Sequence, residues 1–88
     1  MSVQSEDQID DIRRLIALHQ AWLKDPPSGE KADLSRTDLS GMDLSGINLS
    51  KASLTAATLT GTILARANLQ ETDFFAADLS GADMSYAD

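Results

Sequence analysis

The sequence predicts an all-β solenoid of stacked coils, capped at its N-terminal end by one amphipathic α-helix. Between residues 5 and 24, apolar residues recur at every third or fourth position, which is the period of one helix face. From Ala32 onward a large apolar residue recurs at every fifth position, which fits neither a helix nor a regular strand. A repeat that holds its register to the end of the chain predicts a stacked architecture rather than a compact core.

The N-terminal segment, residues 1–31, is predicted to be a capping helix followed by a Pro/Gly linker. Ser5 and Gln8 have the spacing of a capping box, and Pro26 and Pro27 end the helix because proline cannot continue it. The predicted cap residues, which share one apolar face near His19, are Ile9, Ile12, Leu15, Ile16, Trp22 and Leu23. This face should cover the first coil, since repeat arrays need a cap. A helix that dimerises or fills a partner's groove is the alternative.

The second segment, residues 32–88, is a tandem array of five-residue units. Each unit begins with a small or apolar residue, which is usually followed by Asp or Asn. A central large apolar residue comes next, and the residue after it is usually Ser or Thr. We expect the central residues to point inward, with corners at the Ser-Gly, Thr-Ala and Ala-Asp steps. The predicted core residues are Leu34, Leu39, Leu44, Leu49, Leu54, Leu59, Leu64, Leu69, Phe74, Leu79 and Met84. No single coil can bury its own Leu residues, so stability must come from stacking.

The units A-D-L-S-x, T-D-L-S-G, M-D-L-S-G and A-D-L-S-G resemble those of the pentapeptide-repeat family. The resemblance covers residues 32–88 and implies a right-handed, quadrilateral β-helix with four units per coil. Residues 20 positions apart then stack on one another, in about three coils. The chain ends inside a unit at Asp88, so we expect the array to be truncated or to continue beyond residue 88.

The aspartates fall into three outward columns under this arrangement. The columns are Asp33, Ser53 and Asp73; Asp38, Thr58 and Asp78; and Asp43, Ile63 and Asp83. The middle coil is neutral in each column, which avoids direct stacking of like charges. The first interpretation is structural, with the side-chain oxygens accepting nearby backbone N–H groups at the corners. The same six aspartates form the candidate acidic binding face.

The composition excludes several classes of function. A net charge of −7 argues against direct nucleic-acid or anionic-membrane binding. The chain has no cysteine, no apolar run long enough to span a membrane and no signal peptide, so a cytoplasmic location is expected. His19 has no nucleophile at a recognisable spacing, and no phosphate-loop or calcium-loop pattern is present. We predict no catalytic, metal or cofactor-binding residues and no enzymatic activity.

Two functional hypotheses follow. The first is a bacterial structural or protein-interaction module, the N-terminal scaffold or binding domain of a longer protein, with an unidentified protein partner. The alternative, implied by the resemblance, is a DNA mimic that binds DNA gyrase or topoisomerase IV, although this chain has few coils and no C-terminal dimer helix. A folded scaffold without a partner also fits the sequence. The candidate residues for a homodimer contact at the C-terminal end are Phe75, Met84 and Tyr86.

Overall fold

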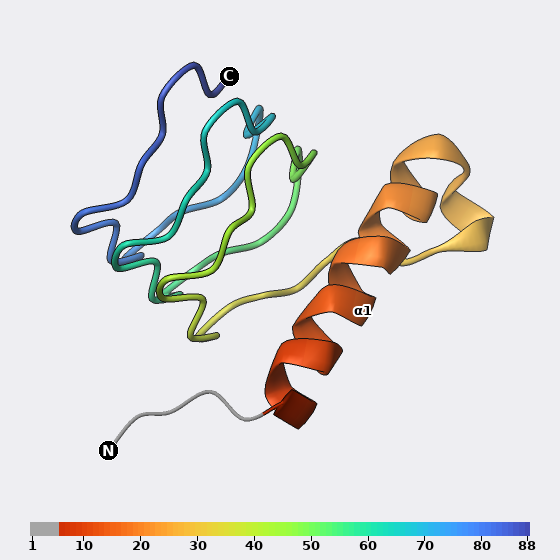
Figure 1. The fold of residues 1–88 in the computed structure, drawn as a ribbon. Helices are drawn as coiled ribbons and strands as arrows, with labels where there is room; N and C mark the ends of the chain where they lie inside the picture. The colour runs from red at the N-terminus through yellow and green to blue at the C-terminus, as the bar shows by residue number, and fades with distance from the viewer. Residues whose placement is uncertain (1–5) are drawn as a thin grey trace.

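The computed structural model shows one helix beside a coil that runs to the end of the chain (Figure 1). Helix α1 (Glu6–Lys24) is followed by a single 3₁₀ turn, η1 (Pro26–Ser28). The structure describes residues 6–88, so the predicted capping box lies partly outside the described residues, at Ser5. The described part of the coil contains isolated β-bridges rather than extended strands.

Residues 20 positions apart pair with one another, as predicted. Parallel bridges join Asp33 to Ser53 and Ser53 to Asp73. The backbone N–H of Leu34 donates to the Ser53 carbonyl at 2.8 Å, and the Ser53 N–H donates to the Ala32 carbonyl at 3.1 Å. The other bridges with this spacing are Asp38–Thr58, Thr58–Asp78, Asp43–Ile63, Ile63–Asp83 and Asn48–Asn68. A coil therefore has four sides, which we number 1 to 4 by the outward residues of the first coil, Asp33, Asp38, Asp43 and Asn48.

Each corner of the coil lies two residues after a central apolar residue and has a left-handed backbone. The corner residues, all with φ between 57° and 71°, are Arg36, Gly41, Gly46, Lys51, Ala56, Gly61, Arg66, Glu71, Ala76, Gly81 and Tyr86. The predicted Ser-Gly and Thr-Ala steps are corners. The predicted Ala-Asp corners are wrong, because Asp33, Asp78 and Asp83 are bridge residues on the flat sides.

The cost of the left-handed corner can be measured by exchanging glycine and alanine. Gly41→Ala is expected to destabilise the protein by about 1 kcal/mol. A Cβ at Gly41, where φ is +71°, meets no atom within 4 Å, so only the backbone conformation is tested. Ala56, with φ 59°, offers the reverse exchange, and Ala56→Gly should stabilise by up to about 1 kcal/mol. Urea unfolding of both variants checks the prediction, and two shifts of the same sign would contradict it.

The interior of the coil is a stack of leucine ladders with small residues between them. Most predicted core residues are buried: Leu34, Leu39, Leu44, Leu49, Leu54, Leu59, Leu64 and Leu69. Ala32, Ala52, Ala57, Thr62 and Ala67 fill the remaining space. In the last coil Phe74 and Leu79 are half-buried and Met84 is 37% exposed, because no further coil packs on their outer side. Burial therefore decreases from the helix toward the C-terminal coil.

Helix α1 packs against the first coil (Figure 1) through the middle of its apolar face. Ile12 and Ile16 are buried in the same cluster as the leucine ladders, and Leu15 packs against that cluster. The other predicted cap residues, Ile9, Trp22 and Leu23, are half-buried. Covering the apolar face of the first coil is what a solenoid cap has to do.

Candidate functional site

His19 joins the cap to two separate parts of the first coil. The side chain is 0% exposed, and its Nδ1 accepts the backbone N–H of Ala32 at 2.9 Å. Nε2 therefore carries the ring proton and donates to the Ser50 carbonyl at 2.8 Å. The ring also stacks on Trp22, with 5.5 Å between ring centroids. The geometry assigns His19 a structural role, and neither ring nitrogen is left for acid–base chemistry.

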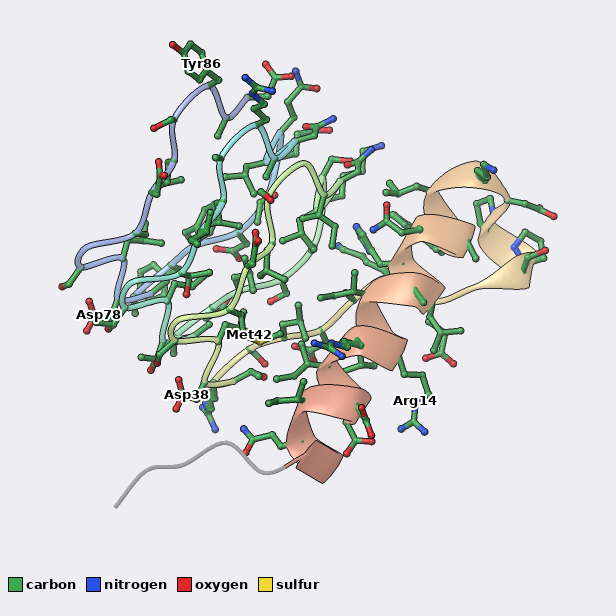
Figure 2. All side chains as sticks on the ribbon, viewed as in Figure 1. Arg14, Asp38, Met42, Asp78 and Tyr86 are labelled. Atoms are coloured by element: carbon green, nitrogen blue, oxygen red, sulfur yellow. The ribbon has the colours of Figure 1, made fainter. Side chains whose placement is uncertain are left out.

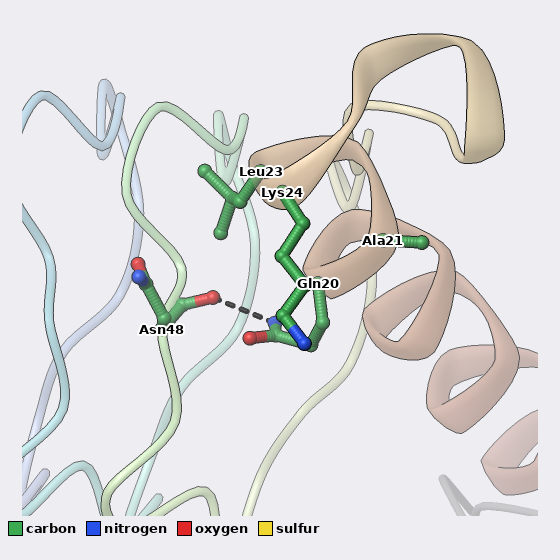
Figure 3. A pocket seen from close by; sticks show the side chains of 5 residues that line it. All are labelled: Gln20, Ala21, Leu23, Lys24 and Asn48. Atoms are coloured by element: carbon green, nitrogen blue, oxygen red, sulfur yellow. Dashed lines mark hydrogen bonds between the residues drawn. The ribbon is translucent and has the colours of Figure 1, made fainter.

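Gln20 continues this polar contact along side 4 (Figure 3). Its Nε2 donates to the Asn48 carbonyl at 2.7 Å. In the next coil the equivalent carbonyl, that of Asn68, accepts the backbone N–H of Leu49 at 2.8 Å. The side-chain amide thus takes the place of a preceding coil. Gln20 also lines an open hollow of about 560 Å³, together with Ala21, Leu23, Lys24 and Asn48. The sequence did not predict this role for Gln20, because two adjacent polar residues beside the apolar face are a weak signal.

The outward Asp and Asn residues hold the corners, as the structural interpretation predicted. Seven of these side chains accept, through Oδ1, the backbone N–H two residues later, at 2.9 to 3.1 Å: Asp33, Asp43, Asn48, Asn68, Asp73, Asp78 and Asp83. Asp38 makes the same contact with Ser40. Where a serine stands two residues after an aspartate, its hydroxyl donates to the same oxygen, as from Ser45 to Asp43 at 2.7 Å. These bonds lock each side chain onto its own corner.

The same bonds stabilise the charged form of four carboxylates. The Ser35 hydroxyl lowers the pKa of Asp33 below its ordinary value of 3.8, and the Ser35 N–H adds to this effect. The pKa of Asp43, Asp78 and Asp83 is lowered in the same way by the serine two residues later. These carboxylates therefore remain charged in mild acid.

We expect the protein to lose stability in acid as these bonds are lost. A carboxyl whose pKa is lower in the folded state stabilises the fold fully above its ordinary value of 3.8. That contribution disappears as the pH falls through the lowered folded value. Urea midpoints measured from pH 6 down to about pH 2 should therefore drop in the acidic part of the range. A variant with asparagine at positions 33, 43, 78 and 83 should show a shallower drop, and an equally steep one would contradict this cause.

The six aspartates of the candidate acidic binding face do not form one face. They lie in pairs on sides 1, 2 and 3, with Ser53, Thr58 and Ile63 between the members of each pair. Two coil spacings separate the members of a pair, about 10 Å, which is close to the Debye length at physiological salt. Repulsion within a pair is therefore largely screened. Figure 2 shows Asp38 and Asp78 at the same edge of the stack, in the first and last coils.

The candidate end-to-end contact is also divided. Phe75 and Tyr86 are 75% and 87% exposed, but Phe75 lies beside the corner residue Ala76, which is half a coil away from Tyr86. Tyr86 projects from the last coil (Figure 2), where its ring lies under the Arg66 guanidinium, 5.9 Å from the ring centroid. Met84 instead follows Leu64 in the stack of side 3, next to the Ile63–Asp83 bridge, and is 37% exposed. The three residues thus offer separate contacts around the last coil rather than one apolar patch.

Neither a metal site nor a membrane-spanning helix is found among the described residues. Among residues 6–88, no group of three or more His, Asp or Glu side chains lies in a position to hold a metal ion. Within the same range, no helix combines the length and the apolar character that crossing a membrane requires. The cytoplasmic location remains a prediction.

Comparisons with known proteins place the coil in a family. The family model for pentapeptide repeats matches residues 32–70 and 52–88, in eight copies. A similar solved structure is that of a pentapeptide repeat protein (Rfr23) from the cyanobacterium Cyanothece 51142, with 34% sequence identity and a TM-score of 0.63. The match covers 64% of this chain and 38% of the cyanobacterial protein, so this chain spans well under half of the length of that protein. Curated proteins provide no match. Because the family model covers more than half of its residues, the chain belongs to the pentapeptide-repeat family.

Proposed function

We propose that the chain is a non-enzymatic protein-interaction module, a right-handed quadrilateral β-helix that binds a basic partner protein through its rigid sides. The observation that carries this proposal is the fixed geometry of the outward carboxylates. In Asp83, for example, Oδ1 accepts the Ser85 N–H at 3.0 Å and the Ser85 hydroxyl at 2.5 Å. The other oxygen, Oδ2, remains available to a partner.

Rigid side chains favour binding because little conformational entropy is lost when a partner contacts them. A flexible surface aspartate would have to be ordered first. Here the backbone of each corner already sets the position of the carboxylate, and the bridge spacing repeats it from coil to coil. The charge of the array selects a partner rich in Lys or Arg, because complementary potentials determine specificity and association rate.

The test compares two variants with the same net charge. In the stack variant, Asp73, Asp78 and Asp83 become asparagine, which keeps the Oδ1 acceptor as Asn48 and Asn68 do. In the control variant, three acidic groups outside the stack are neutralised: Asp10→Asn, Asp11→Asn and Glu30→Gln. Calorimetric titration with a decalysine peptide at low salt should show a larger loss of affinity for the stack variant. Equal losses would mean that net charge alone is responsible, and the proposal would fail.

The DNA-mimic alternative receives less support from the structure. The longest dimension of the molecule, with the helix included, is 38 Å, which is about the length of one turn of a DNA duplex. The same stack variant tests the alternative in a gyrase supercoiling assay. If the parent inhibits gyrase and the stack variant does not, while the control variant does, the DNA mimic becomes the better proposal. Absence of inhibition by the parent would remove it.

The homodimer through the last coil remains a prediction with its own test. Among the described residues 6–88, the backbone N–H groups of Leu79 and Gly81 in the last coil have no hydrogen-bond partner. Light scattering over a hundredfold range of concentration should show a dimer that Tyr86→Lys dissociates. The Tyr86 side chain is 87% exposed, so this change leaves the core intact. A monomer at every concentration would refute the contact.

A further inference from the structure

Helix α1 covers the first coil unevenly. On side 4, His19 and Gln20 bond to the carbonyls of Ser50 and Asn48. On side 3, the backbone N–H and carbonyl of Asp43 and the carbonyl of Ser45 make no hydrogen bond with any residue that the structure describes. The equivalent groups of the next coil are all paired: Ile63 N with Met42 O at 2.9 Å, Ile63 O with Leu44 N at 2.7 Å, and Ala65 O with Gly46 N at 2.8 Å. Side 3 of the first coil is therefore an open edge.

A groove lies at this open edge, between the helix and the coil. Its volume is about 420 Å³, and its lining is mainly apolar: Ile9, Arg13, Ile16, Gly41, Met42, Asp43, Leu44 and Ile47. Arg13 is exposed and forms no ion pair with any described residue, whereas its neighbour Arg14 pairs with Asp11 at 3.1 Å. Unpaired backbone groups, apolar walls and an unpaired cation thus meet in one place.

We infer that this groove binds an extended segment of a partner protein, which adds a parallel strand to side 3 of the first coil. The inference deepens the proposed interaction role by naming a second surface and the chemistry of its partner. Strand addition supplies main-chain hydrogen bonds, while pockets for alternate side chains supply specificity. The segment donates two N–H groups, to the carbonyls of Asp43 and Ser45, and accepts the N–H of Asp43.

The groove also defines the side chains of this segment. In the coil register, the residue whose N–H reaches the Asp43 carbonyl points inward, toward Ile16 and Leu44, and must be apolar. An acidic residue beside it would neutralise Arg13 at the rim. A complete coil of a second copy cannot occupy this end, because α1 lies across it and already bonds to side 4. A single extended segment is the occupant that fits.

The probe is the peptide acetyl-Ala-Asp-Leu-Ser-Gly-amide, which repeats residues 77–81 of the chain. It carries the required leucine, an acidic residue and all three backbone groups. Titration into ¹⁵N-labelled protein should shift the amide resonance of Asp43 and slow its hydrogen exchange. A peptide methylated at the Leu and Gly nitrogens should bind about tenfold more weakly or worse, because it lacks two donors. Equal affinity of the two peptides would overturn the inference.

A pair of charge reversals tests the rim of the groove. Arg13→Glu should weaken the peptide by about tenfold, while Arg14→Glu should leave the affinity unchanged. Shifts at Leu79 and Gly81 instead of Asp43 would place the peptide on the last coil and overturn the inference. Tighter binding after deletion of residues 1–5 would identify that segment as the occupant, against the partner proposed. The stack and control variants leave Arg13 unchanged, so this test and that of the proposed function can fail separately.

Discussion

Gly29→Ala is expected to separate the helix from the coil, at a cost of about 3 kcal/mol or more. The φ angle of Gly29 is −153°, which any residue adopts, so its backbone conformation does not require glycine. Close contact does: an added Cβ would lie 2.3 Å from the Leu18 carbonyl oxygen and 2.5 Å from the Trp22 nitrogen. Both are backbone atoms of α1, so no change of rotamer relieves the clash. The linker must move away, and the hydrogen bond from Glu30 N to Leu18 O, 3.2 Å long, is lost with it.

Urea unfolding followed by Trp22 fluorescence and by far-UV circular dichroism checks this expectation. Gly41→Ala is the matched control, because it adds the same methyl group at a glycine with free space around it. The loss for Gly29→Ala should be about three times that for Gly41→Ala. If the helix detaches while the coil remains folded, Trp22 will report an earlier transition than the circular dichroism signal. A midpoint equal to that of the control would show that the linker accommodates the methyl group.

His19→Phe is the second large effect, with an expected loss of about 3 kcal/mol. Phenylalanine keeps an aromatic ring beside Trp22 and fills most of the same space. It leaves the buried Ala32 N–H and the Ser50 carbonyl without the partners that the histidine ring supplies. An unpaired buried group such as the Ala32 N–H costs about 1 to 3 kcal/mol, and the half-buried Ser50 carbonyl adds a smaller loss. Together these losses outweigh the added apolar area.

The control for this substitution is Gln20→Leu, which removes one side-chain contact to the same side of the coil. Gln20 is half-buried, so water can reach the Asn48 carbonyl that it leaves, and the loss should be about 1 kcal/mol. The ratio of the two losses, measured as free energies of unfolding, separates buried from accessible hydrogen bonds. If His19→Phe were as stable as the parent, water or a small backbone shift would have to satisfy both groups, and the cap would rest on apolar contact alone.

Local patterns in the chain were enough to predict a stack of five-residue units, whereas the four-unit coil was implied by the resemblance to the pentapeptide-repeat family. A central apolar residue every fifth position, with a corner residue two places later, determines which side chains point inward in every coil. The outward columns follow from the 20-residue register that the resemblance implied, and the bridges Asp33–Ser53 and Ser53–Asp73 agree with it. The wrong Ala-Asp corners show the limit of residue preference, since aspartate is common in turns. Here Asp33 lies on the flat side of the coil and accepts the backbone N–H of Ser35, just before the corner.

The sequence by itself determined the five-residue repeat, its leucine core and the presence of an N-terminal helix, because each follows from a periodic pattern of apolar residues. Only the tertiary structure decided how the helix meets the coil. The contact from His19 to Ser50 spans 31 positions, and Gly29 is required by the backbone of α1 rather than by its own turn. The open edge at Asp43 likewise depends on the position of α1, whose polar side chains bond to side 4 of the first coil and not to side 3. Such contacts join two segments whose periods are unrelated, so the periodic pattern of neither segment predicts them.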